Sequence, residues 1–153
     1  VVDRNLEFAN TTGSSTTWVM SNHDVIRHAT RMVIPAGVDG VTFADENKWY
    51  VENRLNHTLD LDLGLARAKA ATLMILALPG STYIYQGEEL GLPDVLDIPS
   101  DQMQDPQWFR GEGKLKSRDG CRVPLPWEKQ GSSFGFGSGG SHLPQPSWYG
   151  LRL

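Results

Sequence analysis

The chain has 153 residues, 39% of them hydrophobic, and a formal net charge of −4 at pH 7. This length is enough for one domain with a hydrophobic core, and the sequence contains neither an internal repeat nor a second domain. The mild acidic balance argues against a nucleic-acid-binding or membrane-surface protein, because both need clustered lysine and arginine. The single cysteine, Cys121, excludes an internal disulfide.

No secretory signal peptide and no membrane-spanning segment is visible in the sequence. The apolar run over residues 61–78 contains Asp62, Arg67 and Lys69, which a spanning helix would tolerate poorly. We therefore expect a cytoplasmic protein. The first residue is Val1 rather than methionine, and the chain opens inside a predicted element, so we also expect an upstream segment.

The first sixty residues contain one clear strand. Residues 1–9 are typical of the end of a helix, and residues 10–15 form a polar segment that predicts a loop. Residues 17–20 are a short, unbroken run of apolar and β-favouring side chains, which predicts a buried parallel strand. The polar sequence Asn22-His23-Asp24 ends this strand. Residues 38–60 are polar and predict mostly irregular structure.

The long helix is the strongest prediction. Residues 61–78 are rich in leucine, alanine and methionine, with Asp60 as the N-cap and Pro79-Gly80 as the stop signal. The helix is apolar nearly all round, so we expect it to be buried. Residues 82–85 predict a second short buried strand. Strand, helix and strand form one βαβ unit of an α/β protein, and its two strands should be parallel.

From Gly91 onward proline and glycine become frequent, and no helical or strand period persists. Residues 91–153 are therefore predicted to be a long Gly/Pro-rich loop region. Within it, residues 131–146 are rich in glycine and serine, which is typical of a flexible loop.

Three stretches, in this order, resemble one known family. The first is Ser21-Asn22-His23-Asp24 followed by Arg27, the second covers residues 79–91 (PGSTYIYQGEELG), and the third covers residues 117–127 (SRDGCRVPLPW). Together they are similar to the α-amylase family of glycoside hydrolases (family 13), in its α-glucosidase and oligo-1,6-glucosidase branch.

The resemblance implies that the chain is part of a (β/α)₈ TIM barrel. Residues 1–153 would be the C-terminal segment of the catalytic domain, with the seventh strand, its helix, the eighth strand and the long loop after it. The first six strands, the nucleophilic aspartate and the proton-donating glutamate would then lie outside the chain. We expect the chain alone to be inactive. We also expect it to pair with the missing N-terminal part of the barrel, or with a second copy, through exposed apolar faces.

The resemblance also assigns roles to single residues. Asp24 would be the carboxylate that stabilises the transition state, and His23 would bind sugar hydroxyls. Arg118 would close the −1 glucose pocket, and Arg122 has the same chemistry. Two aromatic residues among glycines would line a +1 site: Phe134 and Phe136. The expected partner is an α-glucoside oligosaccharide, and we expect no metal and no cofactor.

Each of these residues also has a purely structural interpretation. Asn22-His23-Asp24 is compatible with a plain polar turn in which Asp24 caps the following segment. Arg118 and Arg122 are compatible with surface arginines paired with Asp119 or Glu112. We interpret three other features as structural: Glu88-Glu89 at a helix start, Arg27 as a buried partner of a carboxylate, and Cys121 as a packing residue.

Three functions remain open at this point. The first is a fragment of a retaining α-glucosidase that acts on short α-linked gluco-oligosaccharides. The second is a fragment of a sucrose isomerase or another transglycosylase of the same family, which would differ in how it admits water. The third is a folded piece without catalytic activity.

Overall fold

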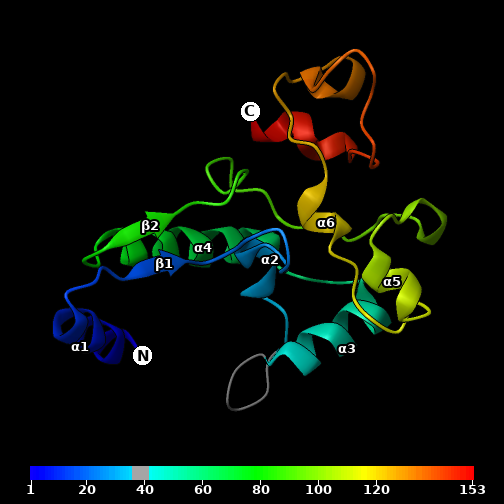
Figure 1. Ribbon diagram of the computed structural model, residues 1–153. Helices are drawn as coiled ribbons and strands as arrows, with labels where there is room; N and C mark the ends of the chain where they lie inside the picture. The colour runs from blue at the N-terminus through cyan, green and yellow to red at the C-terminus, as the bar shows by residue number, and fades with distance from the viewer. Residues whose placement is uncertain (36–41) are drawn as a thin grey trace.

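The computed structural model describes residues 1–35 and 42–153. Its sheet, within these residues, consists of strand β1 (Thr17–Val19) and strand β2 (Ser81–Tyr83), which run alongside helix α4 (Leu61–Leu76) (Figure 1). The strands are parallel, with Thr17 opposite Ser81 and Val19 opposite Tyr83. The predicted βαβ unit and its parallel pairing are therefore confirmed.

Helix α4 begins as predicted and ends slightly earlier. Asp60 is the N-cap, and its Oδ1 accepts a hydrogen bond from the amide of Leu63 at 2.9 Å. The helix ends at Leu76 rather than at residue 78, and the turn to β2 contains Gly80 with a φ of +118°. Among the helices of the described ranges, none is long and apolar enough to cross a membrane.

The βαβ unit is much more exposed than the sequence predicted. Val19 and Tyr83 on the strands are 50% and 63% exposed, and Leu73 and Leu76 on α4 are 70% and 58% exposed. The hydroxyl of Thr82 donates to the carbonyl of Ile75, so alternate strand residues face α4 while their neighbours point away from it. The expected burial is wrong for this chain because nothing in the described residues covers the outward faces. The expected exposed apolar surface is confirmed.

Two helices extend into segments that the sequence predicted to be loop or irregular structure. The helix end predicted over residues 1–9 is present as helix α1 (Val2–Thr12), which continues into the first part of the loop predicted over residues 10–15. It ends before Gly13, which adopts a left-handed φ of 66°. Helix α3 (Phe43–Asn53) lies in the segment that was predicted to be irregular. It begins with a capping box between Thr42 and Asp45, and this local signal prevails over the polar composition. The predicted irregular stretch over residues 38–41 lies outside the described residues.

The core is built mainly by the segment predicted to be a loop. One apolar cluster contains Leu92, Val95, Ile98, Met103, Val123, Leu143 and Tyr149, and a second contains Ile26, Ile34, Tyr50 and Leu96. Residues 91–153 also form short helices: η1 (Ser100–Gln102), α5 (Pro106–Arg110), α6 (Asp119–Arg122), η2 (Ser132–Gly135) and η3 (Ser147–Arg152). The predicted flexible loop over residues 131–146 thus contains the η2 turn and the buried Leu143.

Buried charges fix this C-terminal segment against α3. Lys116 and Glu46 form an ion pair in which both side chains are almost fully buried. Arg54 donates to the carbonyls of Leu96 and Ile98 at 3.2 and 2.7 Å. Charged groups are costly to bury without partners. These contacts therefore hold two parts of the C-terminal segment against α3: the backbone around residues 96–98, and Lys116 just before α6. A short helix, α2 (His28–Arg31), packs against α4.

Candidate functional site

The polar turn after β1 presents Asp24 to solvent. The side chain of Asn22 makes this turn, since its Oδ1 accepts a hydrogen bond from the amide of Asp24 at 2.8 Å. The side chains of His23 and Asp24 are 68% and 50% exposed. Helix α2 has Arg27 at its N-cap and no side-chain cap bond, so Asp24 does not cap the segment that follows it.

Two arginines from the distant end of the chain converge on Asp24. Arg118 is the N-cap residue of α6 and Arg122 is its last residue, so the two are four positions apart and lie on one face. Arg118 Nη1 donates to Asp24 Oδ1 at 2.9 Å, and Arg122 Nη2 donates to the same oxygen at 3.0 Å. Arg122 Nε also donates to the carbonyl of His23 at 2.8 Å. The structure therefore brings together four of the predicted site residues.

The surface pairings considered from the sequence are not the ones that the structure contains. Glu112 lies 3.5 Å from the ammonium of Lys114. Asp119 is buried and accepts hydrogen bonds from the amides of Gln104 and Asp105 and from the hydroxyl of Ser117.

This cluster keeps the Asp24 carboxyl ionised. Desolvation raises the pKa of Asp24, but the hydrogen bond from Arg118 and the charges of His23, Arg118 and Arg122 outweigh it and leave the pKa below its usual value. Only Asp24 Oδ1 is engaged by the two guanidinium groups. Asp24 Oδ2 has His23 Nε2 at 3.4 Å, so this oxygen remains open to a ligand hydroxyl.

Asp105 is a member of the site that the sequence analysis did not identify. Its buried carboxylate accepts three hydrogen bonds from Arg118, one from the backbone amide and two from the guanidinium. The sequence does carry a related signal, since Asp105 followed by Pro106 is typical of a helix N-cap with proline at the first helical position. That signal indicates only a helix start. The contact between Asp105 and Arg118 becomes visible only in the folded structure.

Arg27 joins all three of the stretches that were singled out in the sequence. It is 1% exposed, and its guanidinium donates to the carbonyl of Gln86 at 2.7 Å and to that of Cys121 at 3.0 Å. The guanidinium carbon lies 4.9 Å from the centre of the Tyr85 ring, in a cation–π contact. Its backbone amide, rather than its guanidinium, donates to the carboxylate of Asp94 at 2.8 Å. Arg27 is thus buried as expected, but its side chain binds carbonyl groups.

Cys121 is a packing residue. Its side chain is 1% exposed, and burial raises the pKa of its thiol to about 12. A thiol with so high a pKa is a poor nucleophile at neutral pH.

The two aromatic residues of the predicted +1 site lie in or next to η2. The Phe134 ring centre lies 6.2 Å from that of Tyr149, and Phe134 packs against the larger apolar cluster. Its backbone carbonyl accepts hydrogen bonds from the amides of Trp127 and Glu128. Phe136 is 45% exposed. Their proposed contact with a sugar stays a prediction.

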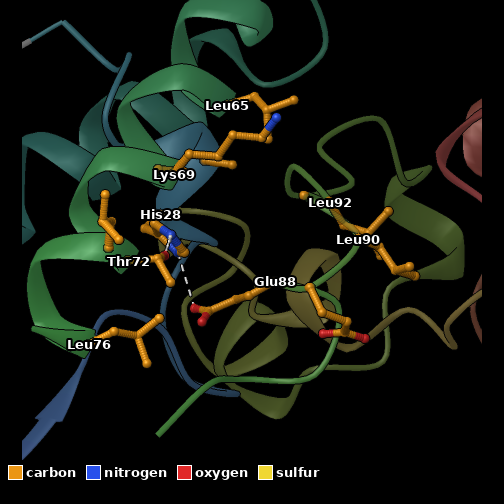
Figure 2. A pocket seen from close by; sticks show the side chains of 13 residues that line it. His28, Leu65, Lys69, Thr72, Leu76, Glu88, Leu90 and Leu92 are labelled. Atoms are coloured by element: carbon orange, nitrogen blue, oxygen red, sulfur yellow. Dashed lines mark hydrogen bonds and ion pairs between the residues drawn. The ribbon is translucent and has the colours of Figure 1, made fainter. Parts of the chain in front are cut away.

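A cavity of about 400 Å³ lies between α4 and residues 88–92 (Figure 2). The buried side chains of His28 and Glu88 meet in it, with Nδ1 and Oε1 3.1 Å apart. Glu88 and Glu89 lie in a turn rather than at a helix start, which corrects the expected position. They do accept hydrogen bonds from nearby amides, those of Tyr85 and Gly87, as structural residues would. This cavity is separate from the Asp24 cluster, since its lining includes neither Asp24 nor Arg118.

A smaller hollow of about 240 Å³ opens where the two strands end. Asn22 of the polar turn lines it together with outward-facing residues of both strands and the residues after them: Thr17, Val19, Ser21, Tyr83, Ile84 and Tyr85. It thus lies next to the turn that carries Asp24. Within the described part of the chain, no group of three or more His, Cys, Asp or Glu side chains is arranged to hold a metal ion.

Comparison with known proteins connects these features to a family. Residues 1–150 match the family described as "Alpha amylase, catalytic domain". A probable alpha-glucosidase of Rhizobium meliloti is 35% identical over 127 residues, covering 83% of this chain and 18% of that protein. Maltase 1 of Drosophila virilis is 30% identical over 146 residues, covering 92% of this chain and 18% of that protein.

The chain is also similar to a solved structure. The alpha-glucosyl transfer enzyme XgtA is similar to this chain with a TM-score of 0.59 and 28% sequence identity, over 97% of this chain and 24% of that one. The chain therefore spans only about a fifth of the length of the relatives that it matches. The match over residues 1–150, together with these relatives, identifies the chain as part of an alpha-amylase family catalytic domain.

Proposed function

We propose that this chain is the C-terminal part of the catalytic barrel of a retaining α-glucosidase that acts on short α-linked gluco-oligosaccharides. In this proposal β1 is the seventh barrel strand, α4 its helix and β2 the eighth strand. The observation that carries the proposal is the convergence of Arg118 and Arg122 on Asp24 at the end of β1. In TIM-barrel enzymes the chemistry lies at the carboxyl ends of the strands.

The remaining chemistry would come from the rest of the domain. Retaining glycoside hydrolysis needs a nucleophilic carboxylate and a proton-donating carboxylic acid, roughly 5–5.5 Å apart. Asp24 would be a third carboxylate that accepts hydrogen bonds from hydroxyls of the −1 glucose. These bonds would strengthen as the ring becomes oxocarbenium-like, and an interaction that is stronger in the transition state raises the rate directly.

The geometry around Asp24 suits this role. The two arginines occupy Oδ1 and leave Oδ2 to receive the hydroxyls. The guanidinium of Arg118 has five N–H groups, of which three donate to Asp105 and Asp24, so two remain for sugar oxygens. His23 beside the carboxylate can donate a further hydrogen bond. Phe134 and Phe136 would contact the neighbouring +1 sugar.

The test is Asp24→Asn in the full-length protein that carries this sequence, assayed on a chromogenic α-glucoside. We expect turnover to fall by at least the order of 10²–10³, because one preorganised group for the transition state is lost. Asp101→Asn is the matched control, since Asp101 is an exposed aspartate in η1. An Asp24→Asn enzyme with nearly unchanged turnover, or robust hydrolysis by residues 1–153 alone, contradicts the proposal.

A second candidate function is glucosyl transfer, as in a sucrose isomerase or another transglycosylase of the family. The structural similarity to an alpha-glucosyl transfer enzyme favours it. The two functions differ in what attacks the glycosyl-enzyme intermediate, water or a second sugar. Product analysis in the presence of excess acceptor sugar separates them, since only a transglycosylase accumulates new oligosaccharides.

A further inference from the structure

The carboxylate of Asp105 has an unusually complete set of partners. Its side chain is fully buried, at the start of α5 (Pro106–Arg110). Oδ1 accepts the amide of Gln107 at 2.9 Å, as an N-cap does. The remaining bonds all come from Arg118: its backbone amide and Nε donate to Oδ2 at 2.7 and 2.9 Å, and its Nη2 donates to Oδ1 at 2.7 Å.

These bonds fix the Arg118 side chain by one edge. The paired contacts of Nε and Nη2 with the two carboxylate oxygens form a bidentate fork, which sets both the plane and the direction of the guanidinium. Nη1, which has no contact with Asp105, is then directed at Asp24 and donates to its Oδ1 at 2.9 Å. The orientation of the group that contacts Asp24 is thus determined by a residue that does not contact Asp24.

The backbone of Asp105 is in turn held in place by Asp119, the residue next to Arg118. Asp119 Oδ2 accepts the backbone amide of Asp105 at 3.0 Å, and Asp119 is 3% exposed. The two stretches, residues 104–107 and 117–119, therefore hold each other in register through two buried carboxylates.

We propose that Asp105 is a positioning residue for the sugar site, because it holds Arg118 by its Nε–Nη2 edge and so limits it to a single contact with Asp24. This inference rests on the proposed function. Without Asp105 the same fork is free to take both oxygens of Asp24. That arrangement would occupy Oδ2, the oxygen that the sugar hydroxyls need.

The test compares Asp105→Asn with the wild-type full-length protein. Asparagine keeps an acceptor for the Gln107 amide, but its NH₂ group faces the donors of Arg118. We expect kcat on a chromogenic α-glucoside to fall about 10²-fold, as a misplacement near 1 Å can cause, while the protein stays folded by circular dichroism. Asp105→Ser, which also keeps an N-cap acceptor, should give the same loss and serves where the asparagine variant does not fold.

A double-mutant cycle shows whether Asp105 acts through Arg118. The Arg118→Lys change replaces the planar guanidinium with an ammonium group, which cannot form the two-point contact with Asp105. In this background Asp105→Asn should therefore lower kcat by less than about threefold. Losses that multiply in the double variant overturn the inference, because Asp105 then acts on turnover by another route.

A readout that does not depend on activity separates this inference from the proposed function. The Nε–H of Arg118 donates to a buried oxygen, so in ¹⁵N NMR of the wild-type protein it should give a resolved signal that exchanges slowly with water. In Asp105→Asn or Asp105→Ser this signal should broaden or disappear. An unchanged Arg118 Nε–H signal overturns the positioning role. Absence of α-glucoside turnover in the wild-type protein, with the signal behaving as expected, contradicts only the proposed function.

Discussion

Asp24 and Arg118 are 94 positions apart in the sequence, and their side chains meet at 2.9 Å. The contact joins the turn after β1 to the start of α6, and Arg122 adds a second guanidinium to the same carboxylate oxygen. Such a pair of charge-assisted hydrogen bonds positions a carboxylate more firmly than a neutral donor can.

Replacement of Arg118 by alanine should weaken the site strongly. The change removes the donor to Asp24 and the N–H groups proposed for sugar oxygens. We expect kcat/KM of the full-length protein on an α-glucoside to fall by about 10²–10³. Arg110→Ala is the control, because Arg110 is an exposed arginine at the end of α5. Equal activity of the two variants contradicts a role of Arg118 in the site.

Asp94 should make stability depend on pH in an unusual direction. Burial raises the pKa of its carboxyl from 3.8 to about 6, while the amide and charge of Arg27 partly oppose this change. Because the folded state binds the proton more tightly, the contribution of Asp94 is most favourable below pH 3.8 and is lost as the pH rises to about 6. The difference in unfolding free energy between wild type and Asp94→Asn should therefore fall by ~3 kcal/mol over this range. Urea unfolding at a series of pH values measures it, and a difference that rises with pH would contradict the assignment.

Gly80 should not tolerate a side chain. It has a φ of +118°, and a Cβ there would lie 2.5 Å from the backbone oxygen of Thr16, the residue just before β1. We expect Gly80→Ala to lower the unfolding free energy by about 1–3 kcal/mol. Gly137 is the matched control, since its backbone is not in the positive-φ region and a Cβ added to it meets nothing within 4 Å. Chemical denaturation of both variants gives the comparison, and equal stabilities would contradict the steric argument.

The exposed apolar side of α4 should cause association when residues 1–153 are produced alone. Leu73 and Leu76 are 70% and 58% exposed, and burying such side chains between copies is favourable. Sedimentation velocity should show concentration-dependent oligomers, which the double change Leu73→Lys and Leu76→Lys should reduce. Leu151→Lys, at an 85% exposed position in η3, is the control and should change little. A strictly monomeric wild-type chain would count against this prediction.

The sequence predicted those elements whose signals are local. The cap at Asp60 and the dense leucine and alanine content predicted α4 nearly to its ends, and the short apolar runs predicted two parallel strands. Helix α3 was missed because the prediction weighed polar composition above the Thr42–Asp45 capping box.

Other features depend on contacts between distant residues. Ile98 and Leu92 are 1% exposed in a segment without periodicity, so no pattern marks them as core. Asp105 and Arg118 are 13 positions apart within that irregular segment, and their pairing becomes visible only once the chain is folded. The strands predicted to be buried are exposed since their outward faces have no cover in the described residues.

The buried Arg27 sets a condition on protein engineering. Its guanidinium bonds the carbonyl oxygens of Gln86 and Cys121, so the backbone path of each loop is matched to the same cation. A chimera that imports residues 117–127 from a relative will keep this junction only if the donor loop brings its carbonyl to the same point. A chimera should therefore exchange residues 21–27, 79–91 and 117–127 as one set.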